Sequence, residues 1–153
     1  MSSGTILLIE DNPSDVALTR RALKKARIAN HLVLAEDGQE ALDYLFGTGA
    51  HQGRDISQLP MLTLLDLKIP KIPGLEVLRR IRSDTRTHRT PVVVLTSSNE
   101  EQDLATSYDL GINSYIRKPV DFTQFANTVE QLGLYWLVLN EQPPKVQGNR
   151  CDA

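Results

Sequence analysis

Five short, mostly apolar runs recur along the chain, at residues 6–9, 31–35, 61–65, 92–95 and 114–117. Runs of this length are typical of buried strands in a parallel sheet whose two faces are both covered. Between the runs, apolar residues recur every three or four positions, as at Leu18, Ala22 and Leu23, which favours helices. Strand and helix therefore alternate, and the pattern predicts five βα units and a doubly wound α/β sheet.

The carboxyl ends of four predicted strands carry acidic, hydroxyl or amino groups. These groups belong to Glu10 and Asp11, to Asp66, to Thr96 and to Lys118. Because the carboxyl ends of parallel strands lie along one edge of a doubly wound sheet, we expect the five side chains to converge. Crowded carboxylates repel one another and need a cation, and Mg²⁺ suits oxygen ligands while leaving room for phosphate oxygens.

This combination of residues predicts phosphoryl transfer. Lys118 supplies a positive charge for one phosphate oxygen, and Thr96 supplies a hydroxyl that can hydrogen-bond another. The carboxylate of Asp66 can then act as the nucleophile and form an aspartyl phosphate. Such a reaction depends mostly on positioning and on neutralising charge, both of which these residues would provide.

In this order and strand context, the residues resemble the response-regulator receiver domain of two-component signalling, over roughly residues 5–132. The resemblance rests on Glu10-Asp11, on Asp66 in Leu-Leu-Asp-Leu-Lys-Ile-Pro-Lys-Ile-Pro-Gly, on Thr96 after Val-Val-Val-Leu, and on Lys118-Pro119. It implies a flavodoxin-like (βα)5 sheet with strand order 2-1-3-4-5. It also implies that a sensor histidine kinase transfers a phosphoryl group to Asp66.

The resemblance assigns further roles within the site. It implies that Mg²⁺ is bound by Asp11, Asp66 and the main-chain carbonyl of Lys68, with Glu10 acting through water. Thr96 and Lys118 would bind the phosphoryl oxygens. Tyr115 would be the aromatic switch residue that responds to Thr96, and the peptide bond before Pro119 would be cis.

Composition limits the remaining possibilities. A chain of 153 residues with 41% hydrophobic content fits one domain, which we place at residues 1–139, followed by a tail at residues 140–153. We expect a stand-alone receiver that signals to an unknown downstream protein. A net charge of −2 gives no electrostatic case for nucleic acid, and the absence of a long apolar stretch predicts a cytoplasmic protein without a membrane contact. Cys151 is the only cysteine, so no disulfide framework is expected.

Two segments are unusual for this family. The connection at residues 47–60 is long, and it is either a contact surface or a mobile insertion; we favour the mobile insertion. The end of the last predicted helix is apolar on all sides at Tyr135, Trp136 and Leu139, which predicts either a homodimer or a fold-back onto the same domain. With the Pro143-Pro144 ending, these features resemble the small regulators partnered with phytochrome histidine kinases, which implies a homodimer.

Three other functions compete with this interpretation. Haloacid-dehalogenase-type phosphohydrolases also use an aspartate nucleophile with Mg²⁺, but they need a second aspartate two residues later, where this chain has Lys68. A flavodoxin would share the fold, but Glu10-Asp11 would repel its phosphate. A pure interaction module whose phosphorylation site is unused remains open. We therefore expect no enzyme activity beyond self-catalysed phosphotransfer and autodephosphorylation.

Overall fold

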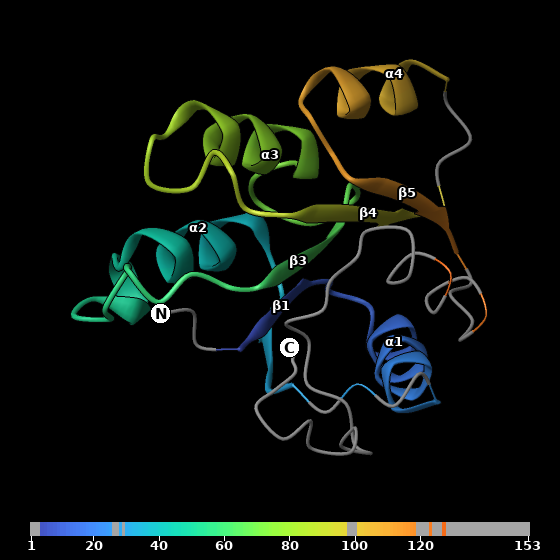
Figure 1. Cartoon of the computed structure of the whole chain (residues 1–153), viewed down its shortest axis with the longest axis horizontal. Coiled ribbons are helices and arrows are strands. Elements are labelled where there is room, and N and C mark those ends of the chain that lie inside the picture. Colours follow the sequence, from blue (N-terminus) through green and yellow to red (C-terminus); the bar gives the residue numbers. More distant parts are fainter. Residues whose placement is uncertain are drawn as a thin grey trace, which may run out of the picture.

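A computed structural model describes residues 4–25, 28, 30–97, 101–118, 123 and 127. These residues build a parallel five-stranded sheet with helices on both faces (Figure 1). The elements, in chain order, are β1 (Ile6–Ile9), α1 (Pro13–Lys25), β2 (Leu32–Ala35), α2 (Gly38–Phe46), the short 3₁₀ helix η1 (Gly49–His51), β3 (Leu62–Asp66), α3 (Gly74–Ser83), β4 (Val92–Thr96), α4 (Glu101–Asp109) and β5 (Ser114–Arg117).

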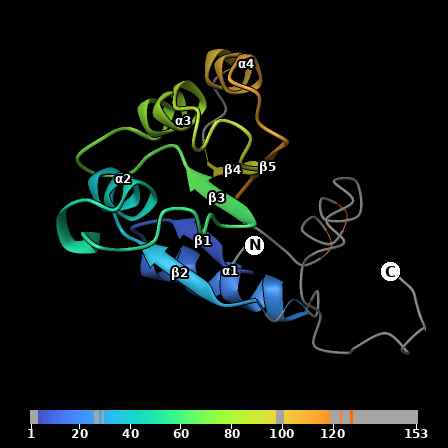
Figure 2. The same ribbon diagram turned by 60° about the vertical axis from the view of Figure 1, so that its left-hand side comes forward.

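The strand order is β2-β1-β3-β4-β5, and all four neighbouring pairs are parallel. The predicted doubly wound flavodoxin-like arrangement is therefore confirmed. Figure 2 shows β1 and β3 in the interior of the sheet, and in a doubly wound sheet the site lies beyond the carboxyl ends of such strands. Asp66 and Thr96 are the last residues of β3 and β4, so both strands end one residue later than predicted.

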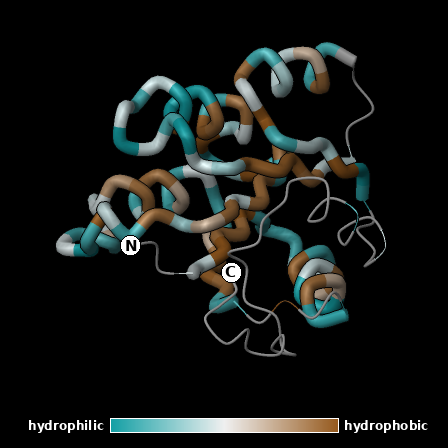
Figure 3. Tube along the Cα trace, viewed as in Figure 1, coloured by the Kyte–Doolittle hydropathy of each residue, from teal (hydrophilic) through white to brown (hydrophobic). Residues whose placement is uncertain are grey.

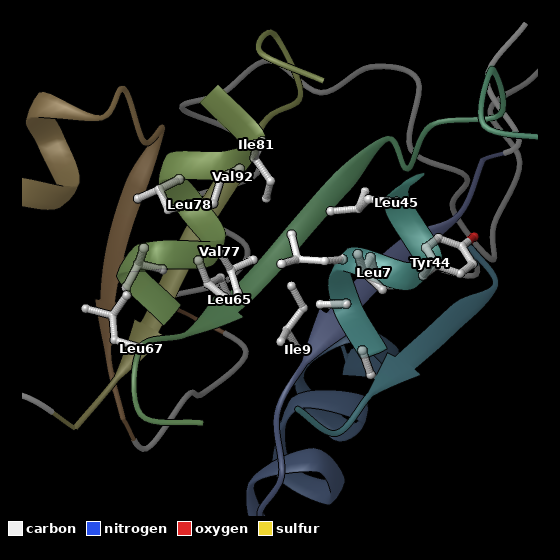
Figure 4. Close-up of a cluster of buried hydrophobic side chains, with 14 of the residues drawn as sticks. Leu7, Ile9, Tyr44, Leu45, Leu65, Leu67, Val77, Leu78, Ile81 and Val92 are labelled. Carbon is white, nitrogen blue, oxygen red and sulfur yellow. The ribbon is translucent and has the colours of Figure 1, made fainter. Parts of the chain in front are cut away.

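Alternate side chains of the central strands enter two separate cores. Leu7 and Ile9 belong to the cluster that also contains buried residues of α2 and α3 (Figure 4), whereas Ile6 and Leu8 belong to the cluster that includes buried residues of α1. All five residues of β3 are buried, so this strand is covered on both faces. Figure 3 shows the same distribution, with hydrophobic strands inside and hydrophilic turns of helix outside.

The helix boundaries follow local chemistry. Asp37 precedes α2 and accepts a hydrogen bond from the backbone N–H of Glu40 at 2.7 Å, which satisfies one of the free donors of the first turn. Gly47 ends α2 in the left-handed conformation, at φ +67°. These caps fix where α2 begins and ends.

The connection at residues 47–60 does not fit the mobile insertion that its length suggested. The guanidinium of Arg54 donates hydrogen bonds to the backbone carbonyls of Tyr44, Leu45, Asp55 and Gln58. Its central carbon also lies 4.0 Å from the centre of the Tyr44 ring. One cation therefore ties the connection to the end of α2, an anchor that loop length alone does not reveal.

Several predictions lie outside the described residues. These are the cis peptide before Pro119, the last helix with Tyr135, Trp136 and Leu139, the tail at residues 140–153, and Cys151. The domain limits are also untested at their carboxyl end. Among the helices that are described, none combines the length and the apolar composition needed to cross a bilayer.

Candidate functional site

The carboxyl edge of the sheet brings the predicted acidic residues together. One carboxylate oxygen from each of Glu10, Asp11 and Asp66 lies within 4.8 Å of the others. Glu10 continues the ladder of β1 through its N–H, which donates to the carbonyl of Ala35 at 2.9 Å. Its backbone is therefore fixed by sheet pairing, and the acidic residues converge as predicted from the strand ends.

Lys118 is the cation at the centre of this group. Its Nζ lies 2.5 Å from Glu10 Oε1, 2.8 Å from Asp15 Oδ2 and 2.9 Å from Asp66 Oδ2. Its backbone N–H donates to the carbonyl of Thr96 at 2.9 Å, which fixes the start of the side chain beside β4. Burial lowers the pKa of Lys118, but the hydrogen bonds to the three carboxylates outweigh burial, and the net pKa is raised. Lys118 therefore stays protonated.

Glu10 is the most deeply buried carboxyl group of the site, with a side chain only 1% exposed. Burial raises the pKa of Glu10 to about 7, because the buried carboxylate loses its hydration and also faces Asp66, and the bond to Lys118 only partly offsets this. The site is therefore short of positive charge. A bound cation would relieve this deficit.

The loop after β3 holds the Asp66 carboxylate in place. The backbone N–H of Lys68 donates to Asp66 Oδ1 at 3.0 Å, while Oδ2 is bound by Lys118. Gly74 closes the loop through its N–H, which donates to the carbonyl of Leu67 at 3.1 Å. A Cβ on Gly74 would lie 2.6 Å from the carbonyl oxygen of Asp66 and 2.5 Å from the Cα of Leu67, so only glycine fits this approach.

Thr96 and Tyr115 lie on the neighbouring strands. Thr96 is completely buried and follows Leu95, the residue that pairs with Asp66 in the sheet. Tyr115 lies on β5, where it pairs with Val94 of β4. It also packs against the core cluster of α2 and α3. The two predicted switch residues are therefore close in register, two positions apart along the paired strands.

The donor set suits a hard divalent cation. Three carboxylates supply oxygen ligands within a small radius, and one of them, Asp11, is exposed at the mouth of the group. Mg²⁺ takes oxygen ligands of this kind and retains water in its other positions. The predicted ligand set of Asp11, Asp66 and the Lys68 carbonyl, with Glu10 nearby, is compatible with this arrangement and stays a prediction.

Sequence reasoning missed one member of this network, Asp15. Sequence reasoning gave this residue no role in the site, yet its carboxylate binds Lys118 from the first turn of α1. The fold contains the signal that could have found it. In a βα unit, the first turn of the helix begins beside the carboxyl end of its strand, so an acidic residue there faces the same edge as Asp66.

Comparisons with known proteins identify relatives of the chain. The response regulator receiver domain matches residues 6–130. Response regulator Rcp1 of Synechocystis sp. (strain ATCC 27184 / PCC 6803 / Kazusa) is 37% identical over 132 residues, which cover 86% of this chain and 88% of Rcp1. The structure of its Mn²⁺-bound form superposes with a TM-score of 0.72 at 36% identity and covers 87% of this chain and 94% of that one.

Two further solved structures are similar. The bacteriophytochrome response regulator RtBRR has a TM-score of 0.82 and 47% identity, covering 94% of this chain and 86% of its own. The phosphorylated cyanobacterial phytochrome response regulator RcpA has a TM-score of 0.71 and 39% identity, covering 86% and 92%. Together with the shared fold and the acidic edge, these matches show that the chain belongs to the response regulator receiver domain family of two-component signalling.

Proposed function

We propose that Asp66 accepts a phosphoryl group from a sensor histidine kinase and that the phosphorylated protein signals through contact with another protein. One observation carries the proposal. The Asp66 carboxylate ends the central strand β3 with one oxygen bound to Lys118 and the other to the Lys68 N–H, beside Glu10 and Asp11. A carboxylate held at both oxygens is oriented before its substrate arrives.

The chemistry of transfer follows from these contacts. An oxygen of Asp66 attacks the phosphorus atom, the P–N bond to the kinase histidine breaks, and the imidazole nitrogen keeps the electron pair and takes up a proton. The Lys118 ammonium, 2.9 Å from Asp66, then binds an oxygen of the transferred group instead of the carboxylate. The Thr96 hydroxyl binds a second oxygen.

Asp11, Asp66 and the Lys68 carbonyl would hold Mg²⁺, with Glu10 acting through water. When bound, Mg²⁺ supplies positive charge for the carboxylates and for the phosphoryl oxygens. The closeness of three carboxylates and the raised pKa of Glu10 support this assignment. The Mn²⁺-bound form of Rcp1, a relative 37% identical, supports it as well.

A phytochrome histidine kinase is the partner that the relatives favour. RtBRR and RcpA both carry phytochrome response regulator in their names, and this chain matches each over most of its length. We expect a ³²P-labelled phytochrome kinase to pass its label to this protein within minutes. A kinase that labels its own regulator under the same conditions but never this chain would contradict the phytochrome assignment, while leaving Asp66 as acceptor.

The phosphoacceptor is tested by intact-mass measurement. Incubation with acetyl phosphate and Mg²⁺ is expected to add the mass of one phosphoryl group to the wild-type protein and nothing to Asp66→Asn. Asp43→Asn is the matched control, because the Asp43 carboxylate on α2 accepts hydrogen bonds from Gln39 and Thr48 and is not part of the strand-end group. If Asp66→Asn still gains the phosphoryl group, the proposal is wrong.

A further inference from the structure

Asp15 belongs to the site through its contact with Lys118. Its Oδ2 lies 2.8 Å from the Lys118 Nζ, whereas the carboxylates that gather within 4.8 Å of one another are those of Glu10, Asp11 and Asp66. Asp15 lies in the first turn of α1, outside that group. Its carboxylate therefore acts on the ammonium group and leaves the cation-binding group to the other three.

The Lys118 ammonium group has three N–H donors, and it has three carboxylate acceptors. These are Glu10 Oε1 at 2.5 Å, Asp15 Oδ2 at 2.8 Å and Asp66 Oδ2 at 2.9 Å. An ammonium group with three acceptors does not turn freely about its Cε–Nζ bond, because rotation breaks charge-assisted hydrogen bonds. One N–H is thus held in the direction of Asp66, the residue that we propose receives the phosphoryl group.

Asp15 itself is held in place by the turn that begins α1. The Asn12 side chain caps this helix, and its Oδ1 accepts hydrogen bonds from the backbone N–H groups of Ser14 at 2.8 Å and Asp15 at 3.1 Å. The backbone N–H of Asn12 donates in turn to Glu10 Oε2 at 3.2 Å. One short segment therefore fixes both Glu10 and Asp15, the two carboxylates that bind Lys118 besides Asp66.

Exposure separates the three acceptors of Lys118. The side chains of Glu10 and Asp66 are 1% and 6% exposed, whereas that of Asp15 is 27% exposed. Asp15 is therefore the acceptor whose charge can be removed with the least disturbance of the core. Its negative charge lies next to the cation that binds the phosphoryl oxygens, so it also opposes the approach of an anionic phosphodonor. Asp15 thus has two opposite effects on transfer, because it orients the ammonium group and repels the donor.

We propose that Asp15 is a positioning residue for phosphoryl transfer, which keeps one N–H of Lys118 directed at the phosphoryl group on Asp66. The inference rests on the proposed function, in which Asp66 is the phosphoacceptor. When a phosphoryl oxygen replaces Asp66 Oδ2 on the ammonium group, Glu10 and Asp15 keep the other two N–H groups where they were. The ammonium group need not be reoriented during transfer, which lowers the barrier.

Asp15→Asn tests this role, because the amide keeps the size of the side chain and removes its charge. Initial rates of phosphorylation are measured on the full chain with Mg²⁺ over a range of acetyl phosphate concentrations. We expect the maximal rate to fall about threefold to tenfold, because a less well oriented ammonium group stabilises the transition state less. The half-saturating concentration should not rise, since a negative charge has been removed. A purely structural loss would lower the maximal rate only in proportion to the folded fraction, which melting curves measure.

The ammonium group of Lys118 can also be observed directly, without any transfer. Its side chain is only 12% exposed and is bound by three carboxylates, so its hydrogens should exchange slowly with water. ¹⁵N NMR of the lysine ammonium groups, recorded in EDTA, measures this exchange in the metal-free protein. We expect the exchange at Lys118 to be about threefold faster or more in Asp15→Asn, because one of the three hydrogen bonds is weakened.

Glu36→Gln is the matched control. Glu36 is an exposed carboxylate that follows β2 at the same edge of the sheet, and it is not among the acceptors of Lys118. A wild-type maximal rate in Asp15→Asn, or unchanged exchange at Lys118, would overturn the role of Asp15 and leave Asp66 as acceptor. An equal loss of rate in Glu36→Gln would overturn it as well. If the wild-type protein gains no phosphoryl group either, the proposed function fails, and this inference fails with it.

Discussion

At the scale of single residues, the site is governed by an excess of negative charge. One ammonium, on Lys118, contacts three carboxylates, while Asp11 adds a fourth acidic group close by. This excess of negative charge adds to the effect of burial at Glu10, and together they raise its pKa to about 7. Protonation of Glu10 and binding of a cation are therefore alternative ways to reduce the same repulsion, and they should compete.

Competition between proton and metal predicts that Mg²⁺ binds more tightly as the pH rises. Glu10 is mostly protonated at pH 6 and mostly ionised at pH 8, since its pKa in the folded, metal-free protein is about 7. We expect the apparent Kd for Mg²⁺, measured by calorimetry, to fall about tenfold between these two pH values. Glu10→Gln should remove most of this pH dependence. A pH-independent Kd in the wild-type protein would contradict the assignment.

The same carboxyl group also affects stability without metal. Its pKa in the folded protein, about 7, exceeds the ordinary value of 4.5, so between these values the folded state holds a proton that the unfolded chain has released. The free energy of unfolding should therefore fall as the pH rises through this window. Urea unfolding of wild type and Glu10→Gln in EDTA checks the sign, because the variant should lack this decline.

The strand-end residues were predicted from sequence, whereas Asp15 was missed. Glu10, Asp66 and Thr96 each follow an apolar run, and in a parallel sheet that position alone places them at the shared edge. Asp15 lies inside a helical segment, where an acidic residue is expected for reasons of helix polarity. Only the packing of α1 against the sheet shows that its carboxylate reaches Lys118.

At the scale of elements, the loop between β3 and α3 determines how Asp66 is presented. Gly74 begins α3 directly against the backbone of Asp66 and Leu67. Gly38 makes a similar approach to this loop from α2, where a Cβ would lie 2.2 Å from the carbonyl oxygen of Ile72. The first residues of α2 and α3 are therefore glycines that lie in direct contact with the backbone of the loop.

Gly74→Ala should therefore impair both folding and phosphorylation. The added methyl group must push the Asp66–Leu67 backbone away, at a cost of about 1–3 kcal/mol in the free energy of unfolding, and it should slow phosphorylation by acetyl phosphate. Gly53→Ala is the control, because Gly53 also disfavours a side chain, at φ +91°, but faces open space. That variant should lose stability and keep the wild-type rate. Equal rates in both variants would contradict the role of Gly74.

Thr96 and Tyr115 are the predicted switch residues. A phosphoryl oxygen bound by the Thr96 hydroxyl would draw the end of β4 toward Asp66, and Tyr115 on the adjacent strand should then change position. Structures with and without beryllium fluoride, a phosphoryl mimic, are expected to differ at both residues, and Thr96→Ala should abolish the change at Tyr115. Unaltered positions in the wild-type protein would refute the coupling.

The strands could be predicted from sequence, whereas the conformation of the connection at residues 47–60 could not. Periodicity located every described strand to within one residue, because buried strands leave a nearly continuous apolar signal. The connection at residues 47–60 has no such signal, and its length suggested mobility. The connection is held by Arg54, whose side chain donates hydrogen bonds to backbone carbonyls of α2. Every residue has a backbone carbonyl, so the sequence of α2 does not reveal these contacts.

At the scale of the whole molecule, we propose that the chain forms a homodimer through the apolar end of the last helix predicted from sequence. The sequence places Tyr135, Trp136 and Leu139 there, beyond the described residues. Sedimentation should give a dimer for the wild-type protein and a monomer for Trp136→Ala, since burying a large apolar side chain stabilises by about 1.5–3 kcal/mol. A wild-type monomer at high micromolar concentration, with and without phosphorylation, would exclude the dimer.

The central claim is that Asp66 becomes an aspartyl phosphate, and reductive trapping tests it most directly. After incubation with acetyl phosphate and Mg²⁺, sodium borohydride reduces an acyl phosphate to the alcohol, so that the modified aspartate becomes homoserine. Tandem mass spectrometry of the peptide around Leu-Leu-Asp-Leu-Lys should then locate homoserine at position 66, and it should be absent when Mg²⁺ is replaced by EDTA. Homoserine at Asp11 or Asp15, with Asp66 unmodified, would contradict the account.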